Sequence, residues 1–168
     1  MPFGFPSNAR GEKACTISNR YKLYASDGVS YVRGSDILQR TDIANKCKIA
    51  LGQLISGHLG EYDENGQTKV FSSLFIMDRG EVCTASYLSI GSFDTIFECK
   101  NAYLYLKTKF VRFLVLQTLT SMHITRGSFA FVPLQDFTRP WTDVDLYAKY
   151  GLTDEEIAFI ESMIKPME

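Results

Sequence analysis

The side chains best suited to acid–base or nucleophilic chemistry are few and widely separated in this sequence. Its histidines, His58 and His123, lie 65 positions apart, and neither stands in a spacing typical of a metal site. A nucleophilic serine or cysteine needs a base beside it, and no such partner is indicated for Cys83, in a predicted strand. The glycine patterns that hold dinucleotides or nucleotide phosphates are absent. We therefore expect no catalytic centre, metal or cofactor in this chain.

The cysteines predict buried thiols rather than a zinc or redox site. No two of them form a C-x-x-C pair, which would pre-position two ligands for a metal. Cysteine is also one of the most frequently buried residue types. We expect four reduced core thiols: Cys15, Cys47, Cys83 and Cys99.

One tripeptide, Glu98-Cys99-Lys100, matches half of the acid and acid-x-Lys signature of metal-dependent nucleases. It falls inside a predicted helix, where positions two apart point in different directions. A nuclease therefore stays a rival interpretation, and divalent-metal-dependent DNA cleavage that disappears in Glu98→Ala would support it.

Charge is unevenly distributed along the chain, although the formal net charge is only −1. Residues 1–132 carry 15 Lys and Arg against 11 acids, whereas residues 133–168 carry 3 against 8. Neutralisation of phosphates supplies most of the non-specific affinity of proteins for DNA. The larger part of the chain can face DNA and the acidic tail cannot, but an excess this modest does not by itself indicate a DNA partner.

Basic and aromatic residues interleave in one stretch near the front of the chain. They are Arg20, Tyr21, Lys22, Tyr24, Tyr31 and Arg33. Aromatic side chains beside positive charge on a strand can stack on bases and contact phosphates. Tyrosines also suit half-buried strands, and an ordinary sheet is our default interpretation of this stretch.

The size and composition of the chain are those of one globular domain. Its 168 residues are 45% apolar, which suffices for a real core. No apolar run approaches the roughly 18 residues that a membrane span needs, and the first residues lack the apolar middle of a secretory signal. We expect a single cytoplasmic domain over residues 1–168, with no membrane partner.

The elements that must position any site are predicted to be strands first and helices last. The strongest local signal is Asp27-Gly28, which lies between two alternating apolar runs and is typical of a hairpin. A short helix is expected around Thr41 to Lys46. Predicted strands cover residues 21–25, 29–33, 47–51, 69–77, 82–90 and 128–133, with a turn at 78–81.

The longest predicted helix runs from about Asp94, as its cap, to Thr120, with apolar residues at helical spacing. Two short helices follow at the C-terminus. Each begins at a threonine with an acid three residues later, the pattern of a capping box: Thr142 with Asp145, and Thr153 with Glu156. The predicted fold class is α+β, with a mixed or mostly antiparallel sheet, one long buried helix and a short C-terminal helical pair.

Several strings of the sequence are similar to one family. They are VCTASYLSIGSFDT, KNAYLYLKTKFVRFLV, TRGSFAFVPLQDF and PWTDVDLYAKYGLTDEEIAFIESMIKPME, with looser matches at PFGF, YKLYASDGVSYV and NKCKIAL. Together they resemble the C-terminal target-recognition domain of bacterial type II restriction–modification proteins that carry an adenine-specific DNA methylase.

The resemblance implies a DNA-reading module of a larger enzyme. In such proteins a catalytic domain precedes this region, binds S-adenosylmethionine and carries an Asn-Pro-Pro-aromatic motif for the flipped adenine. No proline follows an asparagine here, so we expect a fragment without the catalytic half. The implied parent is an N6-adenine DNA methyltransferase, possibly fused to an endonuclease, whose catalytic domain and double-stranded DNA are the partners of this chain.

The expected DNA contacts follow from charge and loop position, because the family resemblance names none. The long loop at 52–68 departs most from the family pattern, and long loops in compact domains are often functional. Our candidates for base or sugar contacts are Gln53, Ser56, His58, Asn65 and Gln67. Our candidates for phosphate contacts are Lys46, Lys48, Lys69, Arg79 and Arg126.

An alternative function remains open at this stage. The acidic tail suits a protein-interaction module that docks onto methylase or nuclease subunits and barely touches DNA.

Overall fold

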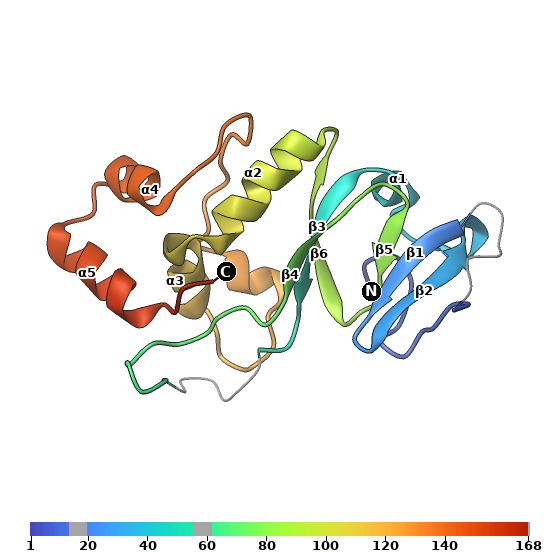
Figure 1. Ribbon diagram of the computed structural model, residues 1–168, viewed down its shortest axis with the longest axis horizontal. Helices are drawn as coiled ribbons and strands as arrows, with labels where there is room; N and C mark the ends of the chain where they lie inside the picture. Colours follow the sequence, from blue (N-terminus) through green and yellow to red (C-terminus); the bar gives the residue numbers. More distant parts are fainter. Residues whose placement is uncertain (14–19, 56–61, 168) are drawn as a thin grey trace. The chain divides into compact units, whose positions relative to one another are not determined.

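A computed structural model of the protein describes residues 1–13, 20–55 and 62–167, which fold into two compact units (Figure 1). Unit 1 comprises Met1–Gln53 and Ser73–Cys99, and unit 2 comprises Leu54–Ser72 and Lys100–Glu168. Each unit is therefore built from two separate stretches of the chain. The expectation that the whole chain acts as one recognition domain stays a prediction.

The first sheet of unit 1 is a three-stranded mixed sheet. Its central strand, β1 (Arg20–Ala25), pairs antiparallel with β2 (Gly28–Arg33) and parallel with β5 (Glu81–Cys83). The predicted hairpin is confirmed. Gly28 has a φ of +140°, a backbone conformation that glycine adopts far more readily than other residues.

The second sheet of unit 1 is a three-stranded antiparallel sheet. Its central strand, β3 (Cys47–Gly52), pairs with β4 (Leu74–Met77) and with β6 (Tyr87–Phe93). All six residues of β3 are buried, as suits the middle of a sheet. The short helix α1 (Thr41–Ala44) precedes β3, and a 3₁₀ turn, η1 (Gly34–Asp36), follows β2.

The core of unit 1 is formed by side chains from both sheets and from the first residues of the chain. Its fully buried members include Phe3, Leu23 and Met77. The complete buried cluster is Phe3, Phe5, Leu23, Val32, Ile37, Ala44, Ala50, Met77, Val82 and Cys83. The aromatic residues that precede the hairpin thus belong to the same core as the sheets.

The prediction of one strand at 82–90 is wrong, because its two halves join different sheets. The chain leaves β5 at Thr84, whose N–H donates to the Tyr24 carbonyl at 2.9 Å. It then turns, with the Tyr87 N–H donating to the Thr84 carbonyl at 3.2 Å, before β6 begins. The strand predicted at 69–77 begins only at β4. Sequence alternation predicts extended backbone but does not reveal which strand will pair with it.

Unit 2 is helical within the described residues. Its elements are α2 (Ile96–Lys107, of which the part from Lys100 onward belongs to this unit), α3 (Lys109–Leu116), the 3₁₀ turn η2 (Arg126–Phe129), α4 (Asp143–Tyr150) and α5 (Asp154–Met163). Both α4 and α5 contact α3. Among the helices described, none is both long and apolar enough to cross a membrane.

The long helix predicted over residues 94–120 is interrupted at Thr108. This residue is extended, with φ −60° and ψ 149°, and its Oγ1 accepts the Val111 N–H at 3.3 Å to start α3. The Asp143 carboxylate accepts two further N–H groups of the same turn, from Lys109 at 3.0 Å and from Phe110 at 2.8 Å. The first N–H groups of a helix have no partner within it, and here a carboxylate from α4 supplies one.

The end of α2, on the other side of the break, is bound by Arg112, which is 3% exposed. Its Nε donates to the carbonyls of Lys107 and Thr108, at 3.0 and 3.2 Å, and its Nη1 donates to the Lys165 carbonyl. The guanidinium therefore binds the last carbonyl of α2 and the carbonyl of the break residue, and it also anchors the chain after α5. Apolar periodicity continues through the break, which explains why the sequence predicts one helix.

Two further expectations are corrected by local hydrogen bonds. The start of α2 is capped by Thr95 rather than Asp94: Thr95 Oγ1 accepts the Glu98 N–H at 3.2 Å. The strand predicted at 128–133 is replaced by η2, where Ser128 Oγ accepts the Thr125 N–H at 3.1 Å. Serine side chains that bond nearby backbone compete with strand pairing in this way.

The predicted C-terminal helical pair is confirmed with both of its capping boxes. Thr142 and Thr153 each accept the N–H of the acid three residues later, and Asp145 and Glu156 accept the threonine N–H in return, both at 2.9 Å. Gly151 ends α4 in the left-handed region, with φ +65°. These short-range signals and the observed elements support the α+β class.

The interruption at Thr108 yields a stability prediction. Thr108→Ala removes the cap of α3 and should lower the free energy of unfolding by about 0.5–2 kcal/mol. Asp143→Ala leaves two N–H groups without their carboxylate and should lower it by about 1–3 kcal/mol. Urea unfolding followed by circular dichroism measures both, with the exposed Thr120→Ala as control. Equal unfolding midpoints in the three variants would contradict this role of the break.

Candidate nucleic-acid interface

The base-reading residues predicted from the long loop do not form one cluster among the described residues. Gln53 belongs to unit 1, where it is half-buried and its Nε2 donates to the Tyr87 carbonyl at 3.4 Å. Asn65 and Gln67 belong to unit 2. Two further candidates lie outside the described residues: Ser56 and His58. The described part of the set is thus divided between the two units.

A tight turn holds the described end of this loop. Asp63 Oδ1 accepts the N–H groups of Asn65 and Gln67, both at 3.0 Å, and Asp63 Oδ2 lies 2.9 Å from Lys165 Nζ. The Gln67 N–H and the Lys165 ammonium lower the pKa of the Asp63 carboxyl. Asn65 is exposed and Gln67 is half-buried, so Asn65 is the better placed of the two to reach a ligand.

Two of the predicted phosphate-binding residues converge on one acid in unit 1. Lys46 Nζ lies 3.1 Å from the Asp94 carboxylate, and Arg79 Nη2 donates to the Asp94 carbonyl at 2.8 Å. A phosphate at this point would compete with an exposed carboxylate. Lys69 and Arg126 are exposed on unit 2.

Lys48 was predicted to contact phosphate and does not fit that role, because its side chain is fully buried. Its Nζ donates to the carbonyls of Ala44, Lys46 and Asp78, at 3.0, 2.9 and 3.0 Å. These three acceptors match the three donors of an ammonium. The alternating position of Lys48 in β3 turns it into the core, where it joins the end of α1 to the turn after β4.

The outward face of the β1–β2 hairpin carries a second set of basic residues, together with aromatic ones. Arg20 is the register partner of Arg33, and Lys22 is the register partner of Tyr31. Directly paired residues share a face of a sheet. The side chains Leu23 and Val32 on the opposite face are buried in the core. We call this side of the hairpin the strand face: Arg20, Lys22, Tyr24, Val29, Tyr31 and Arg33, of which Tyr24 also packs against the core of unit 1.

Lys22 is partly neutralised by a carboxylate at the edge of the strand face. Its Nζ donates to the Tyr24 hydroxyl at 2.6 Å and lies 3.3 Å from Glu81 Oε1. The Tyr24 hydroxyl and the Glu81 carboxylate raise the pKa of the Lys22 ammonium. Arg20 and Arg33 of the strand face are both exposed.

A hollow of about 490 Å³ borders the strand face at Arg33. Arg10, which also lines it, pairs with Asp27 at 2.8 Å. The full lining is Phe5, Arg10, Gly11, Glu12, Tyr31, Val32, Arg33 and Asp36. The hollow presents two guanidinium groups and a tyrosine, but two carboxylates as well, so it suits a group that can both donate and accept hydrogen bonds.

The strand face was not among the predicted contacts, although its residues stand out in the sequence. Alternate spacing places Arg20, Lys22 and Tyr24 on one side of a strand. Only the register shows that Tyr31 and Arg33 lie on the same side, and only the burial of Leu23 shows that this side faces outward. The predicted candidates relied on loop position instead.

The described thiols are buried and poorly suited to nucleophilic chemistry. Cys47, Cys83 and Cys99 are free, while Cys15 lies outside the described residues. Burial raises the pKa of both the Cys83 and the Cys99 thiols to about 12. Since the thiolate is the reactive form, these groups are inert near neutral pH.

The candidate metal ligands of the rival nuclease interpretation are not gathered. Within residues 1–13, 20–55 and 62–167, no group of three or more His, Cys, Asp or Glu side chains is arranged to hold a metal ion. Glu98 is engaged in the cap of α2, where its Oε2 accepts the Thr95 hydroxyl at 2.8 Å. This part of the chain offers Glu98 no partner set for cleavage.

Comparison of the chain with protein-family models, with curated proteins and with solved structures finds no match in any of the three. The strand face is the best candidate interface, because it brings basic and aromatic side chains together on one surface.

Burial of Lys48 predicts a particular pH dependence of stability. Desolvation lowers the pKa of its ammonium from the usual 10.5 to about 8. Between these values the unfolded chain binds the Lys48 proton and the folded chain does not, so the stability of the wild type rises with pH. Relative to Lys48→Met, the wild type should gain up to about 3 kcal/mol from pH 8 to 10.5, at about 1.4 kcal/mol per pKa unit.

The measurement is urea unfolding of both proteins across this pH range. Taking the difference between them removes the contributions of the buried thiols and tyrosines, which titrate in this range in the unfolded chain. The matched control is the exposed Lys100→Met, which keeps Lys48, so its difference from the wild type should stay flat over this range. A difference between wild type and Lys48→Met that stays flat with pH would contradict the shifted ammonium.

Proposed function

We propose that this protein recognises double-stranded DNA and reads its sequence. The observation that carries the proposal is the strand face, where Arg20 and Arg33 face solvent as direct register partners beside Tyr31. Exposed arginine side chains can contact both the phosphates and the base edges of DNA.

At Arg20 and Arg33 the first sheet is two strands wide among the described residues, because β5 pairs with β1 only from Lys22 to Tyr24. The major groove of DNA admits a two-stranded ribbon, and arginine can bind guanine through two hydrogen bonds there. Arginine also makes bidentate contacts to phosphate. The exposed arginines of β1 and β2 are thus placed on an element that fits the groove, with Tyr31 able to stack or to donate a hydrogen bond.

The resemblance of the sequence to target-recognition domains supports a parent enzyme that methylates adenine. Such an enzyme must flip its target base out of the duplex, and a second lobe can grip the DNA while it does so. The lobe needs phosphate contacts for register and base contacts for specificity. In this proposal the catalytic lobe supplies S-adenosylmethionine binding and this chain supplies the reading.

The exposed candidates outside the strand face would serve chiefly for register. Lys69 and Arg126 carry exposed charge on unit 2, and Asn65 is an exposed amide at the end of the loop. Lys46 and Arg79 share Asp94, so we expect them to contribute less. Lys48 has no part in binding.

Removing the arginines of the strand face should weaken DNA binding. In the variant Arg20→Gln with Arg33→Gln, we expect a loss of about 1–3 kcal/mol for each arginine that contacts a base. For each arginine that contacts phosphate, the salt dependence should fall by about one unit of slope. Fluorescence anisotropy with a labelled duplex at several salt concentrations measures both quantities.

The matched control is Lys100→Gln with Lys107→Gln, which removes the same charge from α2. Equal weakening of the two variants would show that only total charge matters and would contradict a role for the strand face.

Sequence reading is tested by binding the full chain to a randomised duplex pool and sequencing the recovered DNA. An enriched motif that survives moderate salt supports base reading, and it should contain an adenine if the parent enzyme methylates that base. Binding without enrichment that collapses as salt rises would reduce the function to phosphate contact. No binding even at low salt would contradict the proposal and favour the interaction module.

A further inference from the structure

A groove between α3 and α5 is lined mainly by apolar residues. Its volume is about 440 Å³, and six of its eight lining residues are apolar. From α3 and α5 respectively come Phe113 and Phe159, whose rings meet edge to face with centroids 6.0 Å apart. The complete lining is Phe110, Phe113, Leu114, Leu152, Glu155, Glu156, Phe159 and Ile160.

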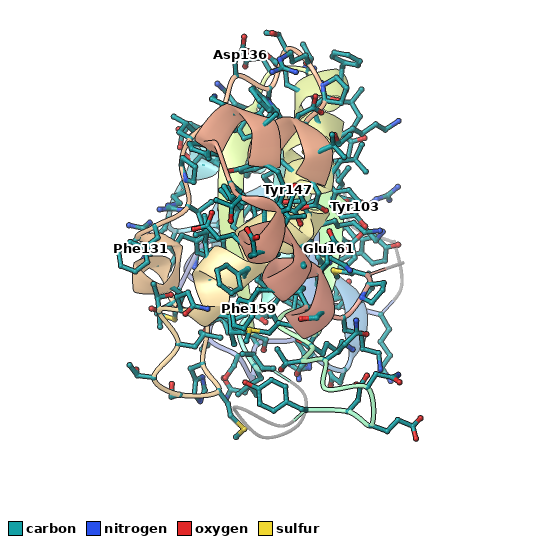
Figure 2. All side chains as sticks on the ribbon, turned by 90° about the vertical axis from the view of Figure 1, so that its left-hand side faces the viewer. Tyr103, Phe131, Asp136, Tyr147, Phe159 and Glu161 are labelled. Atoms are coloured by element: carbon teal, nitrogen blue, oxygen red, sulfur yellow. The ribbon has the colours of Figure 1, made fainter. Side chains whose placement is uncertain are left out.

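Part of the groove is left open to solvent. Phe159 is 53% exposed, and Phe113, Leu114 and Leu152 are half-buried. Figure 2 looks toward α4 and α5 and labels Phe159 on this side of the unit. Contiguous apolar surface of this kind, bordered by polar residues, marks an interaction site in soluble proteins.

The only charged residues of the groove lining are acidic. Glu155 and Glu156 come from the first turn of α5 and lie in the lining together with the phenylalanines. Both acids are exposed, and Glu156 also accepts the Thr153 N–H in the helix cap. The acids repel DNA and anionic lipid, so this groove does not serve the DNA contacts proposed above.

We propose that this groove binds an amphipathic helix of a partner protein whose polar flank is basic. Grooves between helices accept such helices through apolar anchors at positions i, i+3, i+4 and i+7. Anchors of leucine or phenylalanine match the apolar lining, and lysine or arginine beside them matches Glu155 and Glu156. This inference concerns α3 and α5 and does not depend on the strand face.

Charge complementarity favours a basic partner over a second copy of the same chain. Residues 133–168, which supply the α5 side of the groove, carry 3 basic against 8 acidic side chains. Two copies that meet through this face would bring like charges together, and a basic helix would neutralise them.

The test uses the full chain and a designed 18-residue peptide. The probe has leucine or phenylalanine at i, i+3, i+4 and i+7, lysine at the remaining positions and a fluorescent label. Two control peptides have the same apolar positions with glutamate for lysine, or the same composition in scrambled order. Anisotropy should show binding of the lysine peptide at least tenfold tighter than that of either control.

Variants locate the binding on the chain. Phe159→Ala should weaken the lysine peptide at least tenfold, because it removes an exposed ring from the groove. The matched control is Phe131→Ala, since Phe131 is 63% exposed and lies away from Phe159 in Figure 2. Glu155→Lys should weaken the lysine peptide several-fold and improve the glutamate peptide, whereas Glu64→Lys, at another exposed acid, should do neither.

Three results would overturn the proposal. One is absence of binding, and another is equal binding of the lysine, glutamate and scrambled peptides. The third is binding that Phe159→Ala leaves unchanged. Sedimentation of the unliganded chain distinguishes the remaining occupant, because self-association that Phe159→Ala abolishes would assign the groove to a second copy instead.

Discussion

The break between α2 and α3 is the constraint on which unit 2 depends. A continuous helix would leave no exposed helix start for Asp143 to bind, and no carbonyls at Lys107 for Arg112. One carboxylate from α4 and one buried guanidinium thus hold three helices and the chain after α5 together. The direction that α3 takes after the break determines which of its side chains meet α5. The apolar groove is therefore a consequence of the same interruption.

The elements of unit 1 are held in place by a buried charge, the Lys48 ammonium. The Lys48 ammonium lies among three carbonyls from α1, the segment before β3 and the turn after β4. Removal of an ammonium from water is unfavourable unless its donors are satisfied. The three acceptors fulfil that condition and fix where α1 and β4 end relative to β3. The strand face of the other sheet rests on the same core, through Leu23 and Val32.

The parts of the fold that could be predicted depend on short stretches of sequence. The hairpin at Asp27-Gly28 and the caps at Thr142 and Thr153 rely on residues within three or four positions, which the sequence displays directly. The break at Thr108 could not be predicted, because its partner Asp143 lies 35 positions away. Likewise, the burial of Lys48 and the pairing of Arg20 with Arg33 involve residues distant in the sequence, and only the strand pairing reveals them. The phosphate contacts were predicted from residue type and charge, which do not distinguish a buried lysine from an exposed arginine.

The division of each unit between two stretches of chain has a consequence for its synthesis on the ribosome. Residues 54–72 emerge early, yet Thr68 pairs with the backbone of Met163 and Lys165, and Asp63 pairs with the Lys165 side chain. At about 5–20 residues per second, this segment waits roughly 5–20 seconds for its partners. Unit 1 can fold as soon as β6 has been made, whereas residues 62–72 remain without these partners until the C-terminal residues have been made.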